Sequence, residues 1–283
     1  MRCCLLLLLT FAVPARAQQP AADSTVTDTV APGLVHTYMV RQQGPWRLHI
    51  VSVELRGQHF SVRTARALDS LRGREKTTAM ADRARAAGRD VRVALNADFF
   101  DLRTGESVNN QVSDGRIWKA LAMSGTPGGP VKTARGQFGV TRRGRPVIDR
   151  FVFAGILRSG RTFWALDGVN SIPSNGQGLV LWLPEANGRA RADSTRSGRE
   201  LAVRVVRGSW RDSLMLQVRG TVVAADSASI ASGQGVLVAY GAASTRLDSL
   251  VAMSRPFAAL ADWLPSAGSL DELVGGWPVI LRD

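Results

Sequence analysis

The chain has 283 residues, is 45% hydrophobic, and carries a formal net charge of +13 from 36 Lys+Arg residues against 23 Asp+Glu residues. This length allows one large domain or two small ones, and the hydrophobic content is sufficient for an apolar core. The charge raises the question of a nucleic-acid partner. The arginines are spread along the chain rather than gathered in one run with aromatic residues, so the sequence predicts no nucleic-acid partner. A basic nucleic-acid binder is kept as a third hypothesis, which a steep salt dependence of binding would support.

The first 17 residues have the pattern of a signal peptide. Arg2 gives a positive start, an apolar stretch follows, and Ala15-Arg16-Ala17 forms a small-x-small cleavage site. We expect cleavage after Ala17, which removes both cysteines. The mature chain is expected to be exported, periplasmic or extracellular, with no membrane span, because no apolar stretch reaches spanning length. Residues 18–32 are small, polar and proline-containing, which predicts a flexible leader.

Residues 33–150 predict the first part of a mixed α and β domain. The β-rich runs 46–55 and 60–64 indicate two neighbouring strands. A helix is expected over residues 79–87, where Gly88 ends it. The compact apolar run Val91–Leu95 predicts a buried strand. Two further turns are expected to join hairpin strands: Asp114-Gly115 and Arg143-Gly144-Arg145.

Residues 151–252 are almost wholly β in character and predict a β-rich insertion. A short helix over 257–263 and an apolar strand over 274–281 would then continue the first part of the domain as residues 253–283. We expect that strand to pair with the Val91–Leu95 sheet. The predicted fold class is therefore α+β, a mixed sheet with flanking helices that carries a β-rich insertion.

The densest polar group follows the predicted strand Val91–Leu95. It comprises carboxylates and amides near two adjacent phenylalanines: Asn96-Ala97-Asp98-Phe99-Phe100-Asp101, Gly105-Glu106 and Asn109-Asn110. Carboxylates at the end of a rigid strand are well placed to line a pocket, and aromatic rings supply its dry wall. The alternative is an Asx-type turn whose polar groups only cap one another. The three histidines lack ligand spacing and there is no glycine-rich phosphate loop with its lysine, so the sequence predicts neither a metal nor a cofactor.

These residues resemble the signature of the phosphodiester glycosidase family. The resemblance rests on the block Leu95 to Phe100 with Gly105-Glu106, and on Val112-Ser113-Asp114-Gly115. Three further segments support it: Thr78-Ala79-Met80-Ala81, Gln137-Phe138-Gly139-Val140 and Gly275-Gly276-Trp277-Pro278. The β-rich segment with Asn170 and Leu179-Val180-Leu181-Trp182 is similar to an insertion common in bacterial members.

The resemblance implies a hydrolase that releases a sugar from a sugar-phosphodiester bond in envelope or extracellular glycans. Its partner would be a phosphorylated or phosphodiester-linked glycan. Asp98 and Glu106 are the candidates for stabilising an oxocarbenium-like centre and activating water or a nucleophile. The candidate substrate-binding residues are amides, phosphate-clamping arginines and glycines: Asn96, Asn109, Arg63, Arg103, Arg135, Gly275 and Gly276. The alternative function is a non-catalytic envelope module that binds anionic glycans with the same pocket.

One departure from the family pattern concerns activity. Family members continue to an Arg-Thr-Ala segment and an Asp-Gly-Gly-Gly-Ser loop, and neither motif occurs in these 283 residues. We therefore expect the glycosidase-like domain to be incomplete at its C-terminus. The chain as written is expected to be inactive and to expose the strand at residues 274–281 as an open edge.

Overall fold

The computed structural model describes residues 22–56, 59–121, 136–173, 175–186, 198–221, 229–253 and 255–276. The predicted signal peptide at residues 1–17 lies outside the described residues. The chain divides into two compact units, residues 1–61 and residues 62–283. Strands make up 48% of the described residues and helices 12%. The predicted α+β class is therefore wrong, because the protein is mostly β.

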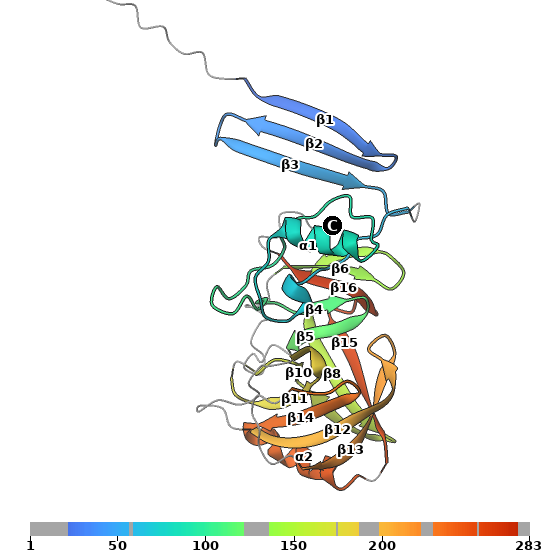
Figure 1. The fold of residues 1–283 in the computed structure, drawn as a ribbon. Helices are drawn as coiled ribbons and strands as arrows, with labels where there is room; N and C mark the ends of the chain where they lie inside the picture. The colour runs from blue at the N-terminus through green and yellow to red at the C-terminus, as the bar shows by residue number, and fades with distance from the viewer. Residues whose placement is uncertain are drawn as a thin grey trace, which may run out of the picture. The chain divides into compact units, whose positions relative to one another are not determined.

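The first unit contains an antiparallel three-stranded sheet, β1(Ser24–Ala31), β2(Leu34–Arg41) and β3(Trp46–Val53) (Figure 1). The expected strand at residues 46–55 is thus present, whereas residues 60–64 form no strand. Residues 24–31 were expected in a flexible leader but form β1. Their alternating threonine and valine side chains suit a paired strand, and the hydroxyls of Thr27 and Thr37 lie 3.3 Å apart across β1 and β2.

Two of the three histidines, which lack ligand spacing in the sequence, meet on this sheet. His36 Nε2 and His49 Nδ1 are 2.9 Å apart, and the rings are stacked with centroids separated by 5.2 Å. The register of β2 and β3, which pairs His36 with Val51 and Tyr38 with His49, places the two rings as diagonal neighbours. Sequence spacing alone gave no sign of this contact.

The second unit contains a 13-stranded sheet with the order β7-β6-β16-β4-β5-β10-β11-β14-β12-β13-β15-β8-β9. Strand β9 also contacts β11, and β8 contacts β5, so the sheet curls around its core. Its strands are β4(Gln111–Ser113), β5(Arg116–Leu121), β6(Gln137–Thr141), β7(Pro146–Asp149), β8(Val152–Ser159), β9(Thr162–Leu166), β10(Gly168–Val169), β11(Gly178–Trp182), β12(Gly198–Ser209), β13(Ser213–Thr221), β14(Gln234–Tyr240), β15(Phe257–Leu264) and β16(Leu270–Gly275).

Helices in the second unit are short. The predicted helix over 79–87 is confirmed as α1(Thr77–Ala86). Helix α2(Ser244–Val251) packs its buried Leu247 and Leu250 toward β12, β13 and β14. Three single 3-10 turns complete the described helical residues: η1(Ala67–Asp69), η2(Pro184–Ala186) and η3(Gly241–Ala243).

Both predicted hairpin turns are confirmed, at Asp114-Gly115 between β4 and β5 and at residues 143–145 between β6 and β7. Other expectations fail. Val91–Leu95 is not a strand, and residues 257–263 form β15 rather than a helix. The apolar run at residues 257–263 is short enough to fit either a helix or a strand. Its pairing with β8 and β13 makes it a strand. Residues 257–264 therefore lie with the β-rich segment, beyond its expected end at 252.

The C-terminal strand also differs from the expectation. Strand β16 spans Leu270–Gly275, and it pairs with β6 and β4 rather than with residues 91–95. A backbone bond of 2.8 Å from Asp98 N to Gly275 O joins β16 to the residues that follow that segment. Residues 277–283 lie outside the described residues.

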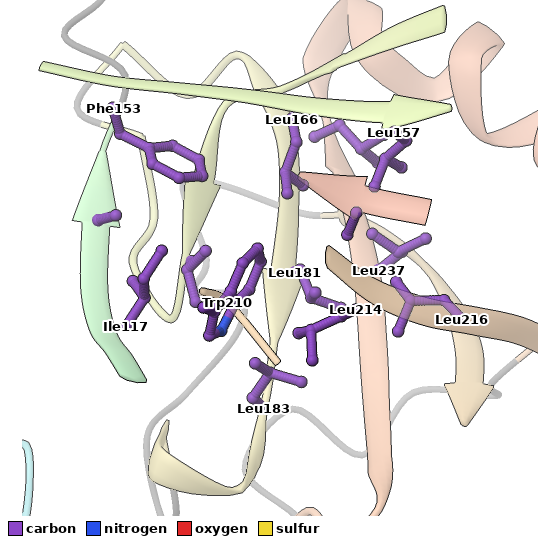
Figure 2. Packing of buried hydrophobic residues seen from close by; sticks show 14 of the residues in the cluster. Ile117, Phe153, Leu157, Leu166, Leu181, Leu183, Trp210, Leu214, Leu216 and Leu237 are labelled. Atoms are coloured by element: carbon purple, nitrogen blue, oxygen red, sulfur yellow. The ribbon is translucent and has the colours of Figure 1, made fainter. Parts of the chain in front are cut away.

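The core of the second unit lies on both faces of β11, whose five residues are all buried. Successive side chains of a strand point to opposite faces. Leu179 and Leu181 accordingly join the main apolar cluster, while Val180 and Trp182 join a second, smaller cluster. Figure 2 shows the main cluster, in which residues distant in sequence, such as Phe153 and Leu237, pack around the same interior.

Candidate functional site

The segment after residue 95 folds into a tight loop that we call the Asp98 loop, residues 96–109. Its two arms meet at the bridge between Phe100 and Ser107, with backbone bonds of 2.9 Å from Asp101 N to Glu106 O and 2.8 Å from Val108 N to Phe99 O. At the tip, the Asp101 carboxylate accepts bonds from the N–H groups of residues 103 and 104. Bonds from the Thr104 N–H and hydroxyl hold the pKa of Asp101 below its ordinary value. The Asx-type turn that we weighed as an alternative is therefore present at Asp101.

Asp98 is held differently, at the base of the loop. Its φ of 55° lies in the left-handed region, which is unusual for a residue other than glycine. One carboxylate oxygen accepts the Ser107 hydroxyl and the Asn109 N–H at 3.2 Å. The other accepts the Asn109 side-chain amide at 2.5 Å and the Phe99 N–H at 2.7 Å. All four surrounding groups donate, and the carboxylate accepts a hydrogen bond from each of them.

Gly275 closes against this carboxylate from β16. A Cβ atom at Gly275 would lie 2.3 Å from both Asp98 Oδ1 and Asn109 Nδ2. Only glycine allows this close approach of the strand backbone. Gly276 donates its N–H to Gly136 O at 2.9 Å, and a Cβ there would meet nothing within 4 Å. The two adjacent glycines therefore differ in what they permit, and Gly275 is the one that shapes the site.

Glu106 lines a cavity of about 330 Å³, which we call the Glu106 cavity. Its buried carboxylate forms an ion pair with Lys119 Nζ at 2.9 Å and a longer one with Arg72 Nε at 3.5 Å. Lys119 also donates to Ser107 O at 2.5 Å. The chain of contacts Asp98–Ser107–Lys119–Glu106 thus connects the two candidate carboxylates. The cavity lining is Arg72, Asp101, Arg103, Thr104, Glu106, Ser107, Val108 and Lys119.

The charges in the lining favour an anionic ligand. Three cations, Arg72, Arg103 and Lys119, face two carboxylates. Arg72 is 41% exposed, so its guanidinium can turn toward a ligand at little cost, whereas the Lys119 side chain is only 9% exposed. Buried charge attracts an opposite charge more strongly than exposed charge does, because water screens it less.

The predicted site residues fall into separate groups. Asp98, Asn109 and Gly275 come together, and Glu106 with Arg103 lines the adjoining Glu106 cavity. Asn96 is exposed and accepts a bond from the Thr77 hydroxyl. Arg135 lies outside the described residues.

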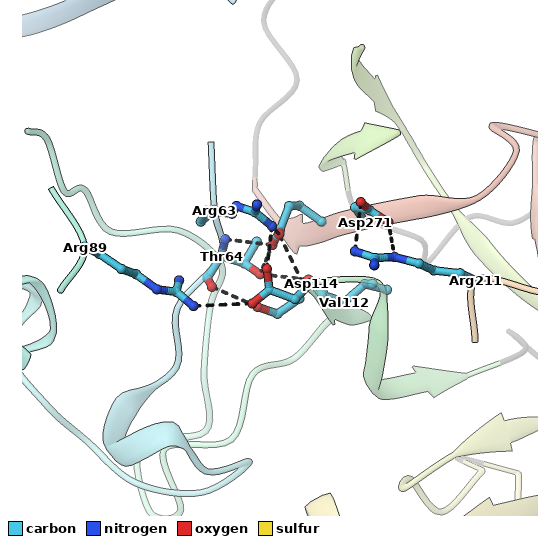
Figure 3. A network of polar contacts seen from close by, with 9 residues as sticks. Arg63, Thr64, Arg89, Val112, Asp114, Arg211 and Asp271 are labelled. Atoms are coloured by element: carbon cyan, nitrogen blue, oxygen red, sulfur yellow. Dashed lines mark hydrogen bonds and ion pairs between the residues drawn. The ribbon is translucent and has the colours of Figure 1, made fainter. Parts of the chain in front are cut away.

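Arg63 belongs to a structural network instead of the cavity (Figure 3). It forms ion pairs with Asp114 and, at 3.1 Å, with Glu272. Glu272 is 1% exposed and also accepts bonds from the Thr64 N–H at 2.9 Å and the Asp114 N–H at 3.1 Å. Burial disfavours the charged form of Arg63, but the bond to Glu272 and the nearby carboxylates outweigh it and raise the pKa of Arg63. This network ties residues 63 and 64 to the β4–β5 turn and β16.

The sequence did not point to Arg72, Ser107 or Lys119. A signal for Lys119 did exist, since it lies between the buried residues Ile117 and Ala120 of β5. A lysine among the buried residues of a strand needs a buried carboxylate partner. Nothing in the local pattern around Arg72 would have identified it.

In the part of the chain that the structure describes, no group of three or more His, Cys, Asp or Glu side chains is arranged to hold a metal ion. The described helices are all too short or too polar to cross a membrane.

The chain matches no known protein-family model. It also matches no curated protein. Among solved structures it resembles a "hypothetical protein from Synechocystis", with a TM-score of 0.63 and 17% identity over 90% of this chain and 44% of that one. A "Putative exported protein" from Burkholderia pseudomallei K96243 gives a TM-score of 0.47 and 15% identity over 87% of this chain and 50% of that one. The chain thus spans about half the length of these structures, and the likeness to the Synechocystis protein shows a shared fold alone.

Proposed function

We propose that the protein is an exported module that binds a sugar-phosphodiester and hydrolyses its bond between sugar and phosphate. The observation that carries this is the arrangement of two carboxylates. Asp98 is held by hydrogen-bond donors alone, and Glu106 lies in an adjoining cavity lined by three cations. The resemblance of the Asp98 loop to phosphodiester glycosidases supports the same reaction. The signal-peptide pattern at residues 1–17 supports export.

The surroundings of both carboxylates suit a reaction in which neither has to act as an acid. Asp98 accepts hydrogen bonds from donors alone, and Glu106 is paired with cations. Ordinary glycosides need a general acid to protonate the leaving oxygen. A phosphate leaves as a stable anion without that proton. The two carboxylates then serve the remaining needs, which are to stabilise positive charge at the anomeric carbon and to accept a proton from water.

The cations would hold the phosphate, and its binding would change which of them contact Glu106. In this structure Arg72 contacts Glu106 through a long ion pair of 3.5 Å. A phosphate oxygen offers a guanidinium a stronger, bidentate partner. Binding of the phosphate would therefore draw Arg72 and Arg103 toward the ligand. The Glu106 carboxylate would keep Lys119 as its cationic partner and would lie closer to the reacting centre.

The test measures binding and turnover separately, because the chain lacks the Asp-Gly-Gly-Gly-Ser motif of the family it resembles. The probes are glucose 1-(methyl phosphate) and N-acetylglucosamine 1-(methyl phosphate), with methyl glucoside as the uncharged control. Calorimetry measures binding, and a reducing-sugar assay measures release of free sugar. We expect Arg103→Gln to weaken binding of the charged probes about tenfold, the loss of one charge-assisted hydrogen bond.

Turnover, where it is seen, should fall by about 10²–10⁴ in Asp98→Asn, as for loss of a group that moves a proton or stabilises charge. Asp90→Asn is the matched control, since Asp90 pairs with Arg92 on the surface. Binding without turnover would favour the alternative, a non-catalytic module for anionic glycans. Absence of both binding and turnover would exclude both functions.

A further inference from the structure

An apolar pair on the Asp98 loop borders the Glu106 cavity. The bond from Val108 N to Phe99 O places these two residues opposite each other on the two arms of the loop. Opposed residues of an antiparallel pair project to the same side. Val108 lines the cavity, and so do Asp101 and Glu106, the opposed pair two residues along each arm. The Phe99 ring therefore projects to the cavity side of the loop.

The neighbouring ring, Phe100, projects to the other side. Side chains alternate along an extended arm, and Phe100 is bridged to Ser107. The Ser107 hydroxyl turns to Asp98, and Ser107 contacts the lining residue Lys119 through its backbone oxygen. Phe99 and Phe100 are thus adjacent and alike in chemistry, and they are 45% and 48% exposed. Of the two rings, Phe99 is the one beside the cavity.

The cavity and its border favour different parts of one ligand. Three cations line the cavity and favour an anion. Beside them, Phe99 and Val108 are each 45% exposed, and Leu102, which lies between two lining residues in the chain, is 76% exposed. Exposed apolar side chains that gather next to a binding site mark a surface that a partner covers. The ligand that fits both parts is therefore amphiphilic, with an anionic group and an apolar arm.

We propose that the substrate of this site is a lipid-linked sugar phosphodiester, with its phosphate in the Glu106 cavity and its alkyl chain on the apolar border. This inference rests on the function proposed above, because it specifies what the phosphate carries besides the sugar. A second sugar in place of the alkyl chain would need hydrogen-bond partners for its hydroxyl groups, and the side chains of Phe99, Val108 and Leu102 supply none. The formal net charge of +13 would also draw the protein to an anionic lipid surface.

Four probes separate the two parts of the ligand. Glucose 1-(methyl phosphate) and glucose 1-(octyl phosphate) differ only in the alkyl chain, and methyl glucoside and octyl glucoside are their uncharged counterparts. Calorimetry below the micelle concentration of each octyl compound measures binding. We expect the octyl phosphodiester to bind at least about tenfold more tightly than the methyl one, since burial of about two of its seven additional methylenes is enough. Octyl glucoside should bind at least about tenfold more weakly than the octyl phosphodiester.

Phe99→Ser and Phe100→Ser are the matched variants. Phe99→Ser removes the ring beside the cavity and should reduce the ratio of octyl to methyl phosphodiester affinity about fivefold. Phe100→Ser removes an equally exposed ring from the other side of the loop and should leave this ratio unchanged. Similar melting temperatures of the two variants would show that the loop is equally well folded in both.

The outcomes distinguish this proposal from the function on which it rests. Equal affinity for the methyl and octyl phosphodiesters would overturn the lipid proposal and leave the proposed function standing. Octyl glucoside that binds as tightly as the octyl phosphodiester would also overturn it, because the alkyl chain alone would then account for binding. Equal changes of the affinity ratio in the two variants would do the same. Binding of neither phosphodiester would overturn the proposed function and the lipid proposal together.

Discussion

Two apolar runs of nearly equal length differ in burial and in secondary structure. Leu179–Trp182, in β11, is buried on both faces and has β10 and β14 as hydrogen-bonded neighbours. Val91–Leu95 is not a strand, and Leu95 is 75% exposed. Apolar composition therefore does not decide burial. A run becomes core only where neighbouring strands satisfy its backbone and other side chains cover its faces.

The Asp98 loop, which follows the exposed run, is held by other forces. Its position depends on the carboxylate of Asp98, the close approach of Gly275 and the buried pair of Glu106 with Lys119. Polar contacts are directional, so they fix side-chain geometry, whereas apolar packing contributes most of the stability. The β11 region and the Asp98 loop should respond differently to substitution.

The largest difference is expected for truncation of leucines. Leu181→Ala opens a cavity in a fully buried position and should lower the free energy of unfolding by about 2–5 kcal/mol. Leu102→Ala, in the Asp98 loop, removes a side chain that is 76% exposed and should change it by less than about 0.5 kcal/mol. Urea denaturation of both variants measures the contrast. Equal losses would mean that the Asp98 loop is packed in solution.

Glu106→Gln should rank next. It leaves the buried ammonium of Lys119 without its anionic partner, which costs about 3 kcal/mol. The double variant Glu106→Gln with Lys119→Met removes the unpaired ammonium charge and should recover part of that loss. A double-mutant cycle from urea denaturation gives the coupling energy of the pair. A coupling energy near zero would show that the two side chains are solvated rather than paired.

A smaller effect, confined to the Asp98 loop, is expected for Gly275→Ala. The added methyl group must push Asp98 and Asn109 aside, at about 1–3 kcal/mol. Gly276→Ala is the control, because a Cβ there meets nothing. Chemical shifts of the Asn109 amide report the displacement directly. Unfolding energies and Asn109 shifts that match between the two variants would contradict the close approach of β16.

The sequence predicted the local features of this protein better than the pairing of its strands and charged side chains. Helix α1, the two hairpin turns and the grouping of Asp98 with Asn109 follow from short-range patterns and the family resemblance. The assignment of residues 257–264 failed because strand pairing with β8 and β13, set by distant residues, overrides local preference. The same holds for Lys119 and Arg72, which reach Glu106 only through the fold.

A gain in stability is expected for Arg66→Met. Burial lowers the pKa of Arg66 to about 10, and the Nε and Nη1 atoms have no hydrogen-bond partner. A base whose pKa falls on folding costs stability while it is charged, here roughly 3 kcal/mol at neutral pH. Its stacking 3.4 Å over the Trp118 ring returns about 2 kcal/mol.

The net gain from Arg66→Met is therefore about 1 kcal/mol, measured by urea denaturation at pH 7. Arg116→Met removes a cation beside the same ring that is paired with Glu185 and should destabilise instead. A loss of stability in Arg66→Met would mean that the stacked guanidinium is a net contributor.

The smallest effect is on acid stability, through Glu75 in the turn before α1. Bonds from Arg83 Nη2 at 2.8 Å and from the Leu68 N–H at 2.8 Å lower the pKa of Glu75. A carboxyl group whose pKa is lower in the folded state adds stability above its unfolded pKa of about 4.3, and that stability is lost as the pH falls through the folded value. Glu75→Gln should therefore lower the melting temperature at pH 7 and flatten its decline below about pH 4.3. Asp90→Asn, which alters an exposed pair with Arg92, should leave the profile close to that of the original protein. If the profile of melting temperature against pH for Glu75→Gln runs parallel to that of the original protein, Glu75 does not contribute to acid unfolding. The bonds to Arg83 would then add no stability.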